Sequence, residues 1–198
     1  MTTLALPAGF CPNGFLLRLS TVERSYASPF AGSEQVVDLL NDRWNASMTL
    51  PNKRHADAAR NEAFIDALRG MTNTVNLYHF ARPVPLGTLR GAPTVVYATG
   101  KGATYLIVSG TPGQTLLAGD MVGIGGLLLR VALDTGVDGT GIMGVTLANR
   151  LRKDIPAGTA VVWDKPTAPF RKVSQSSVRY VPGYAEGASI DFVEAVSL

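Results

Sequence analysis

The chain has 198 residues, which is enough for one domain or two small ones with a real hydrophobic core. Charged residues make up 17% of the chain, against about 25% in an average soluble domain. The net charge of +3 is thinly spread, and Lys53-Arg54-His55 is the tightest basic cluster. Nucleic-acid binding usually requires a basic stripe with stacking aromatics, so this composition argues against sequence-specific nucleic-acid recognition. The low charge indicates that partner subunits cover part of the surface.

The single cysteine, Cys11, excludes an internal disulfide and a cysteine-based metal cluster, and we expect it to serve as a small apolar side chain. The opening MTTLALPAGF lacks the basic region and the long apolar run of a signal peptide. Since no run approaches the ~18 apolar residues of a membrane span, we expect a soluble protein without a membrane span, made in a reducing cytoplasm.

Residues 1–14 are expected to form an irregular segment and residues 15–21 (FLLRLST) a strand, followed by a loop with Ser28-Pro29-Phe30 and Gly32-Ser33. From Gln35 the chain is predicted to be extended until Pro51 ends it. Its second half has the alternation of a half-buried strand. The apolar positions of that alternation are Trp44, Ala46, Met48 and Leu50.

A helix is predicted to begin near Arg54 or His55, with Asp57 in a first turn that favours a carboxylate. Gly70 is placed for a left-handed C-cap. Apolar residues at spacings of 3 and 4 predict the stripe that faces the core. These are Ala56, Ala59, Ala63, Phe64, Ala67 and Leu68, with Ile65 at the edge. The opposite side is expected to carry Asp57, Arg60, Asn61, Asp66 and Arg69.

Residues 75–80 (VNLYHF) are predicted to form the next strand, closed by prolines and glycines. Residues 94–163 hold about six short β-branched runs separated by turn residues, which is typical of a small β-barrel or sandwich. Residues 134–141 (DTGVDGTG) predict a hairpin-type connection within it.

After Trp163, Pro166 and Pro169 predict a stiff crossing, and two final strands, 171–181 and 188–198, are expected on either side of Pro182-Gly183. They should complete a sheet with the N-terminal strands. The predicted fold is therefore mainly β (α+β), a β-sandwich with one packed helix plus an inserted small β-barrel-like domain. The expected domains are a discontinuous one of residues 1–91 and 165–198, and an insertion of residues 92–164.

The residues that could form a catalytic or binding site are explained more simply by structural roles. His55 and His79 lack partners at metal-ligand spacing. Gly123, Gly125 and Gly126 only loosely match a dinucleotide loop, because β-like residues rather than a helix follow them. Residues 109–113 lack the lysine of a phosphate loop. We interpret both glycine-containing segments as turns, and we assign no catalytic, cofactor-binding or metal-binding residue.

Four aspartates, which could suggest paired carboxylates, are interpreted as turn residues for the most part. They are Asp120, Asp134, Asp138 and Asp154. The predicted insertion also carries Tyr97, Tyr105 and Trp163, which leave a carbohydrate-binding module open as an alternative, although we expect Trp163 to pack inside the β-domain. A cell-wall hydrolase is a third, weaker hypothesis.

The stretch RWNASMTLPNKRHADAARNEAFIDALRGM (43–71) resembles the tail proteins of long-tailed phages of Gram-negative bacteria, in which a tryptophan-bearing strand leads to TLP and an alanine-rich helix ending in L-x-G. The stretch from Leu116 to Trp163 is similar to the G-D-x-hydrophobic, D-x-x-G and L-R turns of those proteins. Pro169-Phe170-Arg171 follows, as it does there. Residues 72–91 depart from the family by lacking a glycine-aspartate-proline turn.

The resemblance implies a structural, non-enzymatic minor tail protein, similar to the distal tail protein, at the end of the tail tube. Such proteins form a ring, usually a hexamer, from a belt domain of β-sandwich and helix, and a peripheral β-domain often faces host-binding proteins. The implied partners are copies of itself, the tail tube protein, and the tail hub or tip and tape-measure proteins. The implied location is the virion tail tip, after assembly in the host bacterial cytoplasm, and no cofactor is implied.

Overall fold

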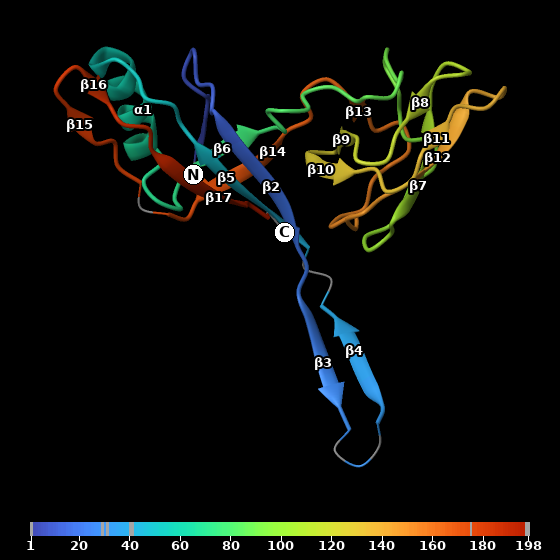
Figure 1. Cartoon of the computed structure of the whole chain (residues 1–198). Helices are drawn as coiled ribbons and strands as arrows, with labels where there is room; N and C mark the ends of the chain where they lie inside the picture. The colour runs from blue at the N-terminus through green and yellow to red at the C-terminus, as the bar shows by residue number, and fades with distance from the viewer. Residues whose placement is uncertain (1, 29, 31, 40–41, 175, 197–198) are drawn as a thin grey trace.

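The computed structural model describes residues 2–28, 30, 32–39, 42–174 and 176–196 (Figure 1). Pro29 of the predicted loop, positions 40 and 41 of the predicted extended segment, and positions 175, 197 and 198 of the predicted final strands lie outside these ranges. The described chain is mainly β with one α-helix, which confirms the predicted fold class. The elements are β1 (Thr3–Leu4), β2 (Gly14–Ser20), β3 (Glu23–Ala27), β4 (Glu34–Asp38), β5 (Arg43–Thr49), α1 (His55–Ala67), β6 (Thr74–Leu77), β7 (Tyr105–Ser109), β8 (Thr115–Leu116), β9 (Met121–Ile124), β10 (Leu127–Arg130), β11 (Thr135–Gly136), β12 (Ile142–Thr146), β13 (Val161–Val162), β14 (Ala168–Lys172), β15 (Tyr180–Val181), β16 (Tyr184–Ala185) and β17 (Ser189–Glu194).

The largest sheet has six strands in the order β1-β6-β14-β17-β5-β2. It joins N-terminal and C-terminal strands, as predicted, and its pairs are antiparallel except β1 with β6. Trp44, Ala46 and Met48 of β5 are buried on one face, and the residues between them point to the other. This strand was predicted well because its two faces meet different surroundings.

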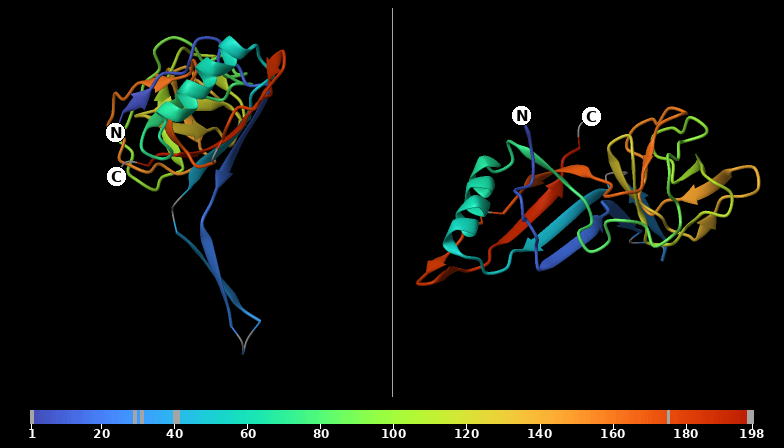
Figure 2. Two further views of the ribbon diagram at one scale, coloured as in Figure 1. Left: turned by 90° about the vertical axis from the view of Figure 1, so that its left-hand side faces the viewer. Right: turned by 90° about the horizontal axis from the view of Figure 1, so that it is seen from above.

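The helix α1 lies along the buried face of this sheet (Figure 2). It begins at His55, directly after the extended Arg54, and carries Asp57 in its first turn, as predicted. At its end, Arg69 (φ 47°) and Gly70 (φ 62°) are both left-handed. Gly70 tolerates this conformation because it lacks a Cβ, whereas Arg69 is a non-glycine residue in the same region.

The predicted buried stripe of α1 is largely wrong. Ala56, Ala59, Ala63 and Ala67 are exposed. The helix instead buries Ala58, Asn61, Phe64 and Ile65, with Leu68 just beyond it. Phe64, Ile65 and Leu68 set the rotation of the helix because they remove much more apolar surface from water than alanines do. Asn61, expected on the polar side, is carried inward with them.

A first cluster of buried side chains fills the space between α1 and the sheet. Its largest members are Trp44, Phe170 and Phe192, which are 0 to 1% exposed. Phe10, from the irregular N-terminal segment, packs edge-on against Phe64 with ring centroids 5.6 Å apart.

A second cluster lies among β7 to β13 and runs from Leu89 to Val161. Short antiparallel pairs surround it, namely β10-β9-β13, β11-β8 and β12-β7. Residues 94–98, which resemble a strand in sequence, form only isolated bridges such as Val95 with Val108. Met121 and Leu128 belong to the first cluster although they lie within residues 92–164. The division into two domains stays a prediction.

The glycine-rich segments are turns, as interpreted. Gly125 (φ 57°) and Gly126 (φ 80°) connect β9 to β10 in a tight hairpin, which requires left-handed residues. The predicted connection 134–141 contains the short strand β11, which pairs with β8, before the turn into β12.

Three predictions about the six-stranded sheet and the C-terminal strands need correction. The strand expected over 75–80 is β6, which ends at Leu77. Pro182-Gly183 does not join two long strands but forms the tip of the short β15–β16 hairpin. Pro169 lies inside β14 instead of in a crossing segment before it.

Candidate assembly surface

A long hairpin of β3 and β4 projects from the rest of the molecule (Figures 1 and 2). It is here called the arm and comprises residues 22–39, of which the structure describes 22–28, 30 and 32–39. The strands pair from Glu23 with Asp38 to Ala27 with Glu34. The ladder extends by one pair at the base, where the Leu39 N–H donates to the Val22 carbonyl at 3.0 Å. Every residue of both strands is exposed. At about 3.3 Å per residue, the arm reaches roughly 20 Å into solvent.

The two faces of the arm differ in chemistry. Residues directly opposite each other in an antiparallel pair point to the same side, so the register in the ladder assigns each residue to a face. The acidic face consists of Glu23, Ser25, Ala27, Glu34, Val36 and Asp38. The apolar face consists of Val22, Arg24, Tyr26, Gln35, Val37 and Leu39. At the tip, Phe30 is 98% exposed.

The base of the arm is held by the loop after β12. Asp38 forms an ion pair with Arg150 at 2.8 Å, and the Asp42 carbonyl accepts a hydrogen bond of 2.9 Å from Arg152. The backbone N–H of Arg150 also donates to the Asp42 carboxylate at 3.4 Å. These contacts fix the point from which the arm leaves the body.

Behind this base lies a buried ion pair between Arg152 and Glu194, whose side chains are 12% and 1% exposed. The second carboxylate oxygen of Glu194 accepts the backbone N–H of Trp44 at 3.0 Å. A buried carboxylate is stable here because a cation and a backbone donor both compensate its lost hydration. Glu194 therefore ties β17, β5 and the loop after β12 together at the root of the arm.

The six-stranded sheet has a second face, here called the open face, which points away from α1. Along β2 it presents Leu16, 62% exposed, and the exposed Arg18. A shallow groove of about 320 Å³ crosses it. Its lining includes Leu16, Arg18, Asn45, Ser47, Val173 and Asp191. The Ser47 hydroxyl donates to one oxygen of the Asp191 carboxylate at 2.7 Å.

The ring of each histidine contacts a backbone group. The Nδ1 of His79 accepts the backbone N–H of Arg82 at 3.1 Å. Burial, and then the positive charge of Arg82, lower the pKa of His79 from its ordinary value, which favours the neutral ring. A ring nitrogen of His55 lies 3.0 Å from the Val181 carbonyl.

The four aspartates considered for acid–base chemistry accept backbone hydrogen bonds, and all except Asp138 accept at least one from a segment distant in sequence. Asp120, 3% exposed, receives the N–H groups of Leu86, Gly87 and Leu117. Asp134 receives Ala118 N–H at 2.7 Å, and Asp154 receives Lys101 N–H at 2.7 Å.

Asp138 organises the turn before β12. The Thr140 hydroxyl donates to it at 2.6 Å and lowers the pKa of the Asp138 carboxyl, and the backbone N–H groups of Ile142 and Thr140 act in the same direction. These contacts are those of an Asx-type turn.

The three aromatic side chains considered for sugar binding differ in how far they are exposed to solvent. Tyr97 and Tyr105 are 61% and 53% exposed. Trp163 is half-buried instead of packed inside the second cluster, and its indole N–H donates to the Gly91 carbonyl at 2.9 Å. The Arg90 guanidinium lies 4.9 Å from the Trp163 ring centroid and covers one of the faces on which a sugar would stack.

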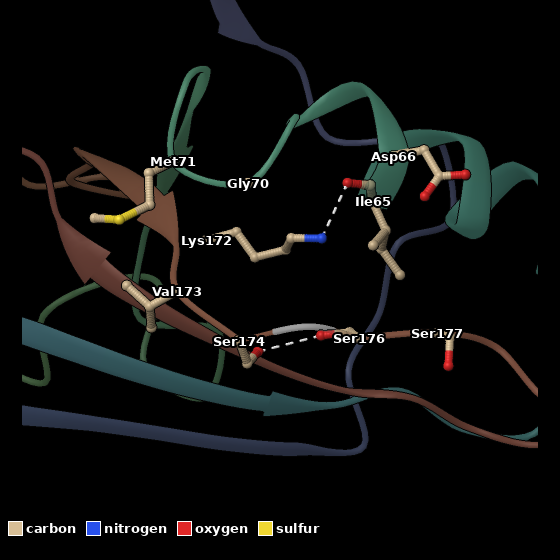
Figure 3. A pocket seen from close by; sticks show the side chains of 9 residues that line it. All are labelled: Ile65, Asp66, Gly70, Met71, Lys172, Val173, Ser174, Ser176 and Ser177. Atoms are coloured by element: carbon tan, nitrogen blue, oxygen red, sulfur yellow. Dashed lines mark hydrogen bonds between the residues drawn. The ribbon is translucent and has the colours of Figure 1, made fainter.

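A cavity of about 410 Å³ lies at the end of α1 (Figure 3). Its lining includes Lys172, Ser174, Ser176 and Asp66. Lys172 is 9% exposed and points toward the helix end, where its ammonium donates to the Ile65 carbonyl at 3.4 Å. A cation at a helix C-terminus is favoured by the helix dipole, so Lys172 has a structural role.

Within the described ranges, no group of three or more His, Cys, Asp or Glu residues is placed to hold a metal ion. Cys11 is exposed and free. No helix of the described chain is long and apolar enough to cross a membrane. A comparison with protein-family models found no match, and a comparison with curated proteins found none either.

The sequence reasoning missed the arm. It placed a loop around residues 28–33 and an extended segment from Gln35. The described residues of that loop lie at the tip of the hairpin, and the extended segment begins within its second strand, β4. The first strand, β3, has the sequence ERSYA and no burial alternation. The usable signal was a turn-rich segment flanked on both sides by β-branched or aromatic residues.

Proposed function

We propose that this chain is a structural protein of the tail tip of a long-tailed phage. Copies of it form a ring, most simply a hexamer, at the distal end of the tail tube. The ring connects the tube to the baseplate and host-recognition proteins, with the tail hub and tape-measure proteins as further neighbours. It is assembled in the host cytoplasm and remains in the virion. The resemblance of residues 43–71 and 116–171 to tail proteins motivates this proposal.

The observation that carries the proposal is the arm. An isolated two-stranded hairpin is only marginally stable in water, and this one exposes Tyr26 at 56% and Val36 at 59%. Exposed apolar side chains gathered on one element mark an interaction surface. A protein that contacts both identical copies and unlike neighbours requires surfaces of different chemistry, and the two faces of the arm supply them.

The root of the arm supports the same proposal. The Arg152–Glu194 pair and the Asp38–Arg150 pair fix where the arm leaves the body. A projecting element held at its base keeps a defined direction, which repeated assembly of identical subunits requires.

The test is the assembly state of the purified protein. We expect concentrated protein, or the assembled particle, to show a six-fold ring by electron microscopy, and sedimentation to show a concentration-dependent oligomer. A variant in which residues 22–39 are replaced by a short Gly-Ser turn serves as the control and should fold but stay monomeric. A wild-type chain that stays monomeric at all concentrations and is absent from virions would refute the proposal.

A further inference from the structure

We propose that the acidic face of the arm docks on the open face of the six-stranded sheet of a second copy of this chain. The contact is centred on the groove beside Leu16 and Arg18. This inference rests on the proposed self-assembly, and it specifies which two surfaces meet.

Charge points to a second copy as the partner. The chain has 18 Lys and Arg and 15 Asp and Glu. The arm holds three of the acids, Glu23, Glu34 and Asp38, and one of the bases, Arg24, so it is net −2. The rest of the chain keeps 17 bases and 12 acids and is net +5. An acidic arm is therefore attracted to the body of an identical neighbour, and such complementarity steers association and fixes register.

The acidic face has two carboxylates available for this contact. Within the described part of the chain, neither Glu23 nor Glu34 forms an ion pair, whereas Asp38 is paired with Arg150. Val36 lies between Glu34 and Asp38 on the same face and is 59% exposed. This arrangement places an apolar side chain at the centre of the face and negative charge at its edges.

The open face presents the matching arrangement on β2. Leu16 is 62% exposed, and Arg18, two residues away on the same side of the strand, is exposed. In the ranges that the structure describes, Arg18 forms no ion pair. The groove of about 320 Å³ has Leu16 and Arg18 in its wall. Docking would place Val36 against Leu16 and Glu34 or Glu23 near Arg18.

The proposed contact joins two different surfaces, the acidic face of the arm of one copy and the open face of another. Figure 1 shows the arm directed away from the sheet of its own chain, so the arm does not cover its own open face. In the proposed ring each copy gives its arm to one neighbour and receives the arm of another. Such a heterologous contact closes into a ring when the rotation between copies divides a full turn. The apolar face of the arm, on the opposite side, stays available for an unlike neighbour.

Two adjacent valines provide a matched test. Val36 lies on the acidic face, and Val37 lies on the apolar face. We expect Val36→Glu to weaken self-association by at least about tenfold in sedimentation, because it adds charge at the centre of the contact. Val37→Glu adds the same charge on the opposite face and should leave self-association unchanged. Circular dichroism of both variants checks that the body stays folded.

A mixing experiment tests the pairing of unlike surfaces. Arg18→Glu alone should also lose the oligomer. When Val36→Glu protein, which keeps its open face, is mixed with Arg18→Glu protein, which keeps its arm, we expect a one-to-one pair that does not grow into a ring. For this test one variant is isotopically labelled and mixed with the other, and native mass spectrometry identifies the pair by its mass.

Three results would overturn the inference while leaving self-assembly standing. In the first, the Val36→Glu and Arg18→Glu variants both form the same oligomer as the wild type. In the second, Val37→Glu weakens self-association as much as Val36→Glu does. In the third, the mixture of Val36→Glu and Arg18→Glu proteins forms no pair. A wild-type chain without any self-association would overturn the proposed function as well, so the two failures are distinguishable.

Discussion

The indole Nε1 of Trp44 donates a 2.8 Å hydrogen bond to the backbone carbonyl of Leu128, 84 residues further along the chain. Trp44 belongs to the six-stranded sheet, and Leu128 lies in β10 of the small sheet β10-β9-β13. The Arg130 guanidinium lies 4.7 Å from the Trp44 ring centroid. A single fully buried side chain thus joins two separately hydrogen-bonded parts of the fold.

Replacing this tryptophan tests that junction. We expect Trp44→Phe to lower the free energy of unfolding by about 1–2 kcal/mol, through the lost hydrogen bond and a small cavity. The Leu128 carbonyl keeps a partner, because Asn149 also donates to it at 3.0 Å. Trp44→Ala should cost about 3–5 kcal/mol. Urea unfolding followed by circular dichroism measures both, and a Trp44→Phe variant as stable as the wild type would contradict the role of the hydrogen bond.

The two ion pairs at the root of the arm should respond differently to mutation. Glu194→Gln leaves the mostly buried Arg152 without a carboxylate, so we expect a loss of about 3 kcal/mol in unfolding free energy. Arg150→Gln breaks a pair whose side chains are 33% and 41% exposed, and it should cost less than about 1 kcal/mol. Urea unfolding at low and high salt compares them, and the Arg150 effect should shrink in salt. Equal costs for the two variants would show that burial does not set these energies.

Stability should depend on pH through His79. Its pKa is lowered below 6.5 in the folded protein, by burial first and by Arg82 and Arg130 after that. Between the folded value and about 6.5 the unfolded chain binds more protons, so the unfolding free energy falls as pH drops through that window. This contribution is fully present above pH 7.

The expected result is a stability loss from pH 7.5 to 5.5 that is smaller in His79→Gln than in the wild type. Urea unfolding at several pH values measures the difference, which cancels contributions from the other titrating groups. Parallel pH profiles for the two proteins would exclude His79 as the source.

The rotation of α1 can be tested with two alanines. Ala58 is 3% exposed, whereas Ala63 is exposed. Ala58→Glu buries a charge and should lower the unfolding free energy by more than about 2 kcal/mol or prevent folding. Ala63→Glu should change it by less than about 0.5 kcal/mol. If thermal unfolding showed Ala63→Glu to be less stable than Ala58→Glu, the helix face predicted from the alanine spacing would be the buried one.

The sequence predicts the parts of the fold in which side chains meet two different environments. The alternation of β5 from Trp44 to Met48 is of this kind, and so is the limit that Pro51 imposes. Alanine, in contrast, carries little information about which helix face is buried, because its small side chain costs little on either face. Asn61 misled the prediction further, since a polar residue at a buried position reverses the pattern.

The arm escaped prediction for a related reason. Both faces of β3 contact solvent, so there was no burial alternation for its sequence to encode. The open face was equally hidden, because the groove beside Leu16 and Arg18 forms only when β2 pairs with β5, which brings Ser47 and Asn45 next to them. The sequence shows the individual residues of these surfaces, but strand pairing in the folded protein decides which of them lie side by side.

Along the chain the arm follows β2 and precedes β5, and β5 is hydrogen-bonded to β17 over the pairs from Thr49 with Ser189 to Asn45 with Val193. A pull on the tip along the strands would therefore load the β5–β17 ladder in shear. In that geometry the hydrogen bonds carry force together, whereas a pull across the strands would break them one after another. A neighbour that pulls the arm along the strands would thus meet the higher resistance of the sheet.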